Sequence, residues 1–116
     1  MLIVNLKLYF VAFDETDLRF KVYLDEQGLT PTIQLNAEDE IDDCIFEKTL
    51  DFFYGDTRSL MDSCKLSRIE KENNEISIVY NIYCYEDLNC KSGKFVSFDK
   101  NSIELYRFAQ NRGKYG

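Results

Sequence analysis

Residues 31–55 read PTIQLNAEDEIDDCIFEKTLDFFYG, and within this stretch the apolar residues begin to recur every three or four positions. Because a helix brings residues three and four apart onto one side, this spacing predicts an α-helix. Asn36 or Asp39 is placed to accept a hydrogen bond from the free amides of its first turn, and Gly55 to end it in a left-handed conformation. The apolar face of this main helix comprises Ile41, Cys44, Ile45, Leu50, Phe53 and Tyr54.

Upstream of the helix, apolar and polar residues alternate, which is typical of β-strands. Residues 2–13 predict a long strand whose even-numbered face is buried. The acidic segment 14–17 turns the chain, and residues 20–24 predict a second strand that pairs with the first. A short extended piece around Ile33 and Leu35 then leads into the helix.

Downstream of the helix the pattern again has a period of two. Residues 64–70 and 75–85 flank the polar turn 71–74, and this arrangement predicts a β-hairpin. Residues 95–98 predict a brief final strand, and residues 102–111 a short C-terminal helix. Strands on both sides of a main helix indicate the α+β class.

Length and composition favour one folded domain. The chain has 116 residues, of which 45% are hydrophobic and 15% aromatic, and this is enough to build one hydrophobic core. No internal repeat or linker divides the sequence. We therefore expect residues 1–116 to form a single α+β domain, with the last few residues as a flexible tail.

The cysteines and the N-terminal residues favour a cytoplasmic protein. Cys44, Cys64, Cys84 and Cys90 form no C-x-x-C pair and are sparse for a disulfide scaffold, so we expect reduced thiols. The apolar N-terminal run lacks the basic region of a signal peptide and carries Lys7 within it. No run approaches the roughly 18 apolar residues of a membrane span, so no membrane association is expected.

The sequence contains no histidine and no tryptophan. The absence of histidine excludes a Ser-His-Asp triad, a Cys-His pair and any metal site with histidine ligands. Catalysis in this chain would have to depend on carboxylates, lysine, tyrosine, cysteine or a bound metal ion.

The formal charge of -7 is concentrated in the first half of the chain. Residues up to Thr57 include 4 basic and 13 acidic residues, whereas the remainder includes 10 basic and 8 acidic ones. An acidic surface repels the phosphates of nucleic acid, so direct nucleic-acid binding is not expected. It favours a protein partner with a basic surface, while the oligomeric state is left open by the sequence.

Carboxylates are densest at the start of the predicted helix, where they occur as Glu38, Asp39, Glu40, Asp42 and Asp43. In one interpretation they are solvated and interact favourably with the positive end of the helix dipole. In the other, Glu40, Asp43 and Glu47 share one helical face, because they are spaced by three and four residues, and offer oxygen ligands to Mg2+ or Ca2+. No second acidic cluster completes such a metal site.

The order of the predicted elements, together with residues 31–55, resembles the Nudix hydrolase family. That family's signature runs Gly, five residues, Glu, seven residues, then Arg-Glu-apolar-x-Glu-Glu-x-Gly-apolar. With Gly55 as the second glycine, Glu40 matches the first glutamate, Leu50 the apolar position, and Lys48 replaces the arginine. The resemblance implies a mixed β-sheet packed against a main central helix and a short C-terminal helix.

The departures from the Nudix signature include the positions that bind metal in the family. In the same register Gln34 replaces the first glycine, Thr49 the glutamate after the arginine, and Phe52 and Phe53 the glutamate pair, while Asp56 replaces the last apolar residue. In the family these glutamates hold the divalent cations, and phenylalanine cannot bind Mg2+ or act as a base. A register shifted by two residues places Glu47 and Asp51 on acidic positions but a lysine on the apolar one. We therefore expect no catalytic residue, no bound metal and no cofactor.

Our first hypothesis is a catalytically inactive Nudix-like domain that acts as a binding or regulatory module through protein–protein interaction. The candidate partner-binding residues are Glu38, Asp39, Asp42, Tyr83 and Tyr85. The acidic residues would contact a basic partner, and the tyrosines would serve as anchors if they are exposed. At a period of two, the same tyrosines also fit packing within the sheet.

Two alternatives remain open at this point. A divergent Mg2+-dependent pyrophosphohydrolase of nucleoside diphosphate derivatives would use Glu40, Asp43 and Glu47, with Asp51 as a further candidate and the metal as its cofactor. An acidic inhibitor would imitate the charge of nucleic acid and occupy a DNA- or RNA-binding protein. The small size and the Asn, Ile, Tyr and Phe content also suit a phage accessory protein or one from another AT-rich genome.

Overall fold

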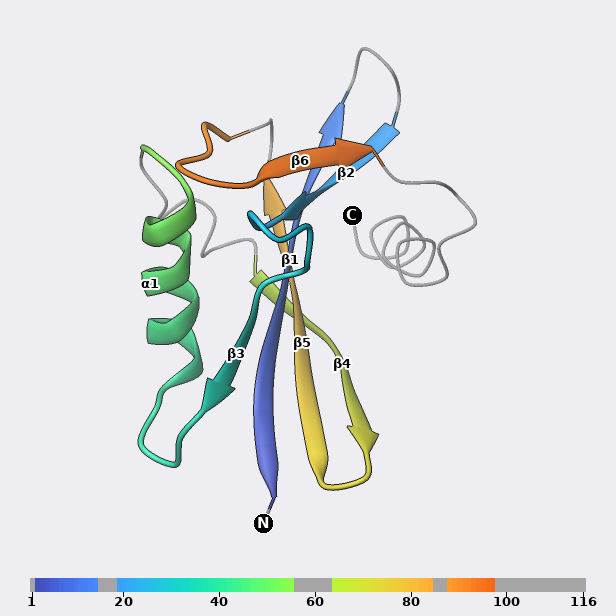
Figure 1. Ribbon diagram of the computed structural model, residues 1–116, viewed down its shortest axis with the longest axis vertical. Helices are drawn as coiled ribbons and strands as arrows, with labels where there is room; N and C mark the ends of the chain where they lie inside the picture. The colour runs from blue at the N-terminus through green and yellow to red at the C-terminus, as the bar shows by residue number, and fades with distance from the viewer. Residues whose placement is uncertain (1, 15–18, 56–63, 85–87, 98–116) are drawn as a thin grey trace.

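The computed structural model describes residues 2–14, 19–55, 64–84 and 88–97 (Figure 1). In this part of the chain one helix packs against a six-stranded sheet, which confirms the α+β class. The predicted C-terminal helix over residues 102–111 lies outside the described residues. The elements in chain order are β1 (Ile3–Asp14), β2 (Arg19–Leu24), β3 (Thr32–Leu35), α1 (Ile41–Phe52), β4 (Cys64–Glu72), β5 (Glu75–Cys84) and β6 (Lys94–Ser97).

β1 is the central strand of the sheet, whose order is β4-β5-β1-β2-β6 with β3 also paired to β1. β1 runs parallel to β5 along most of its length, from Ile3 opposite Glu75 to Ala12 opposite Cys84. β2 and β3 are both antiparallel to β1, and they pair with its second and first halves respectively. Since β5 occupies one edge of β1, β2 and β3 share the other. The predicted pairing of the first two strands is thus confirmed.

Both faces of β1 are buried at its centre. The even-numbered face, predicted to be buried, carries Leu6, Leu8, Phe10 and Ala12, each 0% exposed and packed in the core that also contains Ile45 of α1. On the opposite face Tyr9 and Val11 are also buried, together with Val22 and Val79. A strand covered on both sides needs apolar residues at consecutive positions, as in the sequence LYFVA of residues 8–12.

The helix begins at Ile41, after the first acidic residues that were predicted to lie at its start. Glu40 is the N-cap residue, and its carbonyl oxygen accepts a hydrogen bond of 3.1 Å from the Cys44 amide, but its side chain makes no capping hydrogen bond. The prediction that Asn36 or Asp39 caps the first turn is wrong. The Asp39 carboxylate instead accepts a hydrogen bond of 2.8 Å from the Asn36 amide, within a local turn that precedes the helix.

The end of the helix also differs from the prediction. α1 ends at Phe52, and Phe53 has an extended backbone with φ -130° and ψ 149°. Gly55 does adopt a positive φ of 99°, but it lies beyond the extended Phe53 and does not terminate the helix. The chain leaves α1 by pairing with another segment, so a left-handed stop is not required at this point.

The predicted β-hairpin is present, as β4 and β5 joined by a turn in which Asn73 has a φ of 54°. The register shifts between Leu66 and Arg68, where a β-bulge interrupts the ladder. β6 follows as a short strand antiparallel to β2, in agreement with the predicted final strand. Within the described residues, no helix has the length and apolar character needed to cross a membrane.

Candidate functional site

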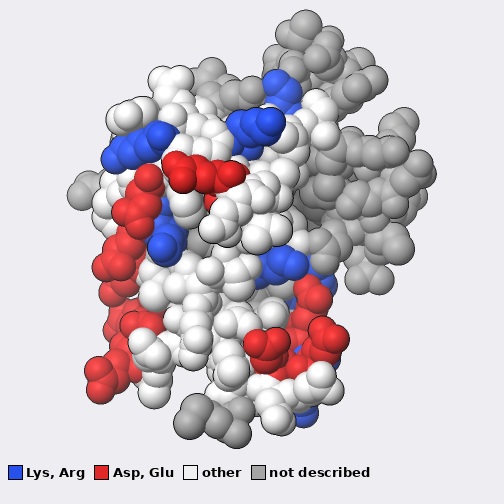
Figure 2. All heavy atoms as spheres, viewed as in Figure 1, with Lys and Arg blue, Asp and Glu red and all other residues white. Residues whose placement is uncertain are grey.

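The solvent side of α1 and of the segment before it is acidic. Figure 2 shows this as a band of carboxylates running down the side of the molecule where α1 lies. Asp42 and Asp43 belong to the first turn of the helix, where negative charge interacts favourably with its free amides. We call this surface the acidic face; it comprises the exposed residues Glu38, Asp39, Glu40, Asp42, Asp43 and Glu47.

The three candidate metal ligands, Glu40, Asp43 and Glu47, are all exposed on this face. Glu40 lies at the N-cap, and the other two lie on successive turns of α1. Among the described residues, no three Asp, Glu or Cys side chains are arranged to hold a metal ion. The structure therefore places these carboxylates along one surface but does not gather them around a common centre.

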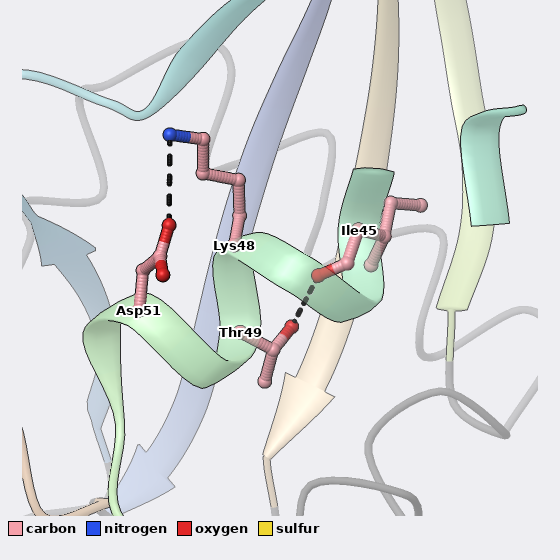
Figure 3. A network of polar contacts seen from close by, with 4 residues as sticks. All are labelled: Ile45, Lys48, Thr49 and Asp51. Atoms are coloured by element: carbon pink, nitrogen blue, oxygen red, sulfur yellow. Dashed lines mark hydrogen bonds and ion pairs between the residues drawn. The ribbon is translucent and has the colours of Figure 1, made fainter. Parts of the chain in front are cut away.

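The opposite side of α1 faces the sheet. Ile45 and Thr49 are the buried residues of the helix. The Thr49 hydroxyl donates a hydrogen bond of 2.7 Å to the Ile45 carbonyl oxygen, as Figure 3 shows. On the solvent side, Lys48 and Asp51 form an ion pair of 3.8 Å (Figure 3). Thr49, which replaces a glutamate of the Nudix signature, is thus a 0% exposed core residue whose hydroxyl is bonded within its own helix.

The two phenylalanines that replace the glutamate pair belong to a group of packed rings. Phe53 is 1% exposed, and Phe52 is partly buried beside it. The centroid of the Phe53 ring lies 5.0 Å from that of Phe10, 4.8 Å from that of Tyr23 and 5.8 Å from that of Phe95. We call Phe10, Tyr23, Phe52, Phe53 and Phe95 the aromatic cluster. It fills the space between the end of α1 and the sheet with apolar rings.

A second segment closes the end of the helix. The Lys91 amide donates a hydrogen bond of 2.7 Å to the Phe52 carbonyl oxygen, and the Tyr54 amide one of 2.9 Å to the Asn89 carbonyl oxygen. Phe53 forms an antiparallel bridge with Cys90 between these bonds. The Lys91 ammonium also lies 5.3 Å from the centroid of the exposed Tyr54 ring. The backbone after α1 is therefore held in place by hydrogen bonds to residues 89–91.

Tyr23 is the central residue that sequence analysis missed. It is 0% exposed, and its hydroxyl donates a hydrogen bond of 2.6 Å to the Ser92 carbonyl oxygen. In the sequence, Tyr23 lies between Val22 and Leu24, and alternation grouped it with Lys21 rather than with the core. Because both faces of the sheet are buried, alternation could not show which face of β2 packs against α1. The aromatic residues present in both β2 and the end of the helix are the sequence feature that could have indicated the role of Tyr23.

Burial raises the pKa of the Tyr23 hydroxyl. Above pH 10, the usual pKa of tyrosine, the unfolded chain releases this proton while the folded protein retains it, so stability is lost as pH rises. We expect Tyr23→Phe to lower the free energy of unfolding by about 1 kcal/mol at neutral pH, through loss of the Ser92 hydrogen bond. The difference between the two proteins should shrink above pH 10 in urea denaturation at several pH values. A difference independent of pH would contradict this assignment.

The pKa of the Cys44 thiol is sensitive to the negative charges of the acidic face. Partial burial, followed by the charges of Asp39, Glu47 and Asp43, raises the pKa of its thiol. We expect Cys44 to react with iodoacetamide more slowly than an ordinary cysteine near neutral pH, because the thiolate is the nucleophile. Glu47→Lys should accelerate alkylation of Cys44, measured by mass spectrometry of the labelled peptides. Glu75→Lys, at the start of β5, is the control, because Glu75 is not among the charges that raise this pKa, and it should leave the rate unchanged. An equal acceleration there would contradict a local effect.

Of the two tyrosines proposed as anchors, Tyr83 and Tyr85, the structure describes only Tyr83. Tyr83 is partly buried and packs against the apolar cluster formed by Tyr9, Val11, Val22 and Val79. The Lys65 ammonium lies 5.9 Å from the centroid of its ring. Tyr83 therefore contributes to sheet packing, as one of the two interpretations anticipated. Tyr85 lies outside the described residues.

Solved structures provide the comparison for this fold, since no family model and no curated protein sequence matches the chain. A MutT/nudix family protein from Enterococcus faecalis aligns with 88% of the chain at a TM-score of 0.61 and 9% identity. The chain spans only 46% of that protein. The NUDIX domain of Shewanella oneidensis NrtR, solved with ADP ribose, aligns over 100% of the chain and 90% of its own length, at a TM-score of 0.62 and 9% identity. Together with the mixed sheet and its helix, these similarities show that the chain has a Nudix-like fold.

Proposed function

We propose that this protein is a catalytically inactive Nudix-like domain that binds a protein partner with a basic surface through its acidic face. The observation that carries the proposal is the burial of Phe53 in the aromatic cluster, at the signature position where the resembling family has a metal-binding glutamate.

Three residues that replace glutamates of the Nudix signature have structural roles in the core, which supports catalytic inactivity. Phe52 and Phe53 pack against Phe10 and Tyr23, and Thr49 is bonded to its own helix. None of the three side chains bears a carboxylate, and hydrolysis of a pyrophosphate needs metal ions that neutralise the charge of the phosphates. Without such ions, the acidic face repels a phosphorylated substrate.

The charge and exposure of the acidic face support a protein partner. The acidic residues are exposed and adjacent, so they produce a negative potential on one side of the molecule (Figure 2). Potentials of this kind accelerate association with an oppositely charged protein and select against partners of like charge. Part of this surface is on a helix, which keeps the charges in fixed positions relative to one another.

The first test is a hydrolysis assay with Mg2+ or Mn2+ and a panel of nucleoside diphosphate derivatives. ADP ribose belongs in the panel because the Shewanella oneidensis domain was solved with it. We expect no turnover above that of a heat-denatured sample. Turnover that is lost in Glu40→Gln or Glu47→Gln would overturn the proposal and favour a divergent hydrolase.

The second test concerns the acidic face directly. Affinity capture from cells that express the protein should recover a partner with a basic surface, and Asp42→Lys combined with Glu47→Lys should abolish its recovery. The control, Glu26→Lys combined with Glu75→Lys, makes the same charge change at exposed residues in a turn and at the start of β5. Equal recovery by the two double variants would show that the acidic face is not the binding surface.

A further inference from the structure

The edge strand β4 carries exposed apolar side chains. It lies at one end of the sheet, and among the described residues it pairs only with β5. Leu66 is 53% exposed and Ile69 is 62% exposed. A strand with one paired edge presents its remaining N–H and C=O groups to the solvent, where another strand can bind them. With nine residues, β4 is longer than a typical strand of about five or six.

The register with β5 assigns the side chains of β4 to the two faces of the sheet. Leu66 and Ile69 lie opposite Tyr80 and Ile78 and share the face that carries α1. The other face carries only charged residues of β4. In order along the strand these are Lys65, Arg68, Glu70 and Glu72, which lie opposite Asn81, Val79, Ser77 and Glu75. Positive charges therefore occupy the first half of this face and negative charges the second.

We propose that β4 pairs antiparallel with β4 of a second copy of this chain, about a twofold axis at Ile69. In this arrangement the basic half of one strand meets the acidic half of the other. Arg68 of each copy lies across from Glu70 of the other, and the two Ile69 side chains meet at the axis. Interfaces with twofold symmetry require such self-complementary surfaces.

The β-bulge refines this register. The bulge at residues 66–68 inserts an extra residue into β4, so positions beyond it shift by one relative to a regular partner strand. With the shift, Lys65 of one copy lies across from Glu72 of the other, on the same face as the Arg68–Glu70 pairs. Without it, Glu72 would lie opposite the apolar Leu66. The bulge thus aligns both pairs of opposite charges in one register.

The ion pair within β4 is compatible with this interface. Arg68 contacts Glu70 of its own strand at 3.0 Å, and the side chain of Glu70 remains 44% exposed. A guanidinium has five N–H donors and can bind two carboxylates at once. The inner pair thus holds Arg68 in position for the carboxylate of the second copy. Pairing would also cover Ile69 on both chains.

The experiment is sedimentation velocity of the full chain over a concentration series, with two variants of reversed charge. Lys65→Glu with Arg68→Glu makes this face of β4 entirely acidic, and Glu70→Lys with Glu72→Lys makes it entirely basic. We expect the wild type to dimerise and each variant alone to dissociate at least about tenfold more readily, because like charges then face each other. An equimolar mixture of the two variants should recover the dimer, since each strand then meets its opposite.

The mixture separates this proposal from loss of folding. Two misfolded variants would not restore each other, and the circular dichroism spectrum of each provides a direct check. Asp42→Lys with Glu47→Lys, on the acidic face, is the control and should leave the wild-type dimer unchanged. A wild type that stays monomeric throughout the series, or dimers that persist in both β4 variants, would overturn the proposal. The proposal would also be overturned if the equimolar mixture of the two variants did not dimerise more strongly than each variant alone.

Discussion

Phe53→Glu is expected to lower the free energy of unfolding by about 4 kcal/mol or more, although it restores a glutamate of the Nudix signature. The Phe53 side chain is 1% exposed and packs against Phe10, Tyr23 and Phe95. The substitution removes these contacts and places a carboxylate among apolar rings that offer it no counter-charge. The expected result is a large decrease in the denaturant midpoint, with no gain of Mg2+ binding by calorimetry.

Leu50→Glu is the matched control for this substitution. Leu50 lies in α1, three residues before Phe53, and is 41% exposed, so a carboxylate there remains hydrated. Its cost should stay within about 0.5 kcal/mol, the usual range of surface substitutions. If Phe53→Glu were as stable as Leu50→Glu and bound Mg2+ tightly, the aromatic cluster would not be essential to the core, and the signature position would still be a metal site.

Gly93→Ala is expected to destabilise the protein by about 2 to 5 kcal/mol, from backbone strain and overpacking together. Gly93 has a φ of 73°, which alanine adopts only with strain. A Cβ atom there would overlap the Leu24 carbonyl oxygen and would lie 2.5 Å from the Tyr23 hydroxyl oxygen. To make room, the Tyr23–Ser92 hydrogen bond would have to break or β2 would have to move. Thermal or urea denaturation measures the loss.

Gly28→Ala separates the two contributions. Gly28 has nearly the same φ, 77°, but a Cβ atom there would have no atom within 4 Å. The variant therefore carries the backbone strain alone, about 1 to 2 kcal/mol. The excess loss in Gly93→Ala measures the steric overlap with Tyr23 and Leu24. Equal losses in the two variants would mean that the contact between Gly93 and Tyr23 does not constrain the fold.

Local periodicity was sufficient to locate most of the elements. In β1, β5 and the helix around Ile45, buried apolar residues recur at the regular spacing of a strand or a helix, so the sequence alone indicates the element. The ends of α1 could not be predicted in the same way. Asp39 has the chemistry of a helix cap but is used in a preceding turn, and Gly55 has that of a helix stop but lies beyond the end. Residues at such positions satisfy several local geometries, and long-range contacts select among them.

In the candidate site, too, local features could be predicted from the sequence and long-range contacts could not. The acidic face could be predicted from the sequence, because five of its six carboxylates lie within residues 38–43. The contact between Phe53 and Tyr23 could not, because it joins residues of α1's end and β2 that no local pattern relates. The hydrogen bond from Lys91 to Phe52 is equally remote in sequence. Sequence comparison with the Nudix signature identified Phe52 and Phe53 as departures, and the structure shows what these rings do.

The parallel pairing of β1 with β5 has a consequence for synthesis on the ribosome. Ile3 pairs with Glu75 and Ala12 with Cys84, so one edge of the central strand has no partner until almost the whole hairpin has been translated. Until then the apolar run of residues 8–12 is available to other nascent chains, and such exposed strands are prone to aggregate. The sheet can therefore close only late in synthesis, and β1 is most exposed to aggregation in the interval before β5 emerges.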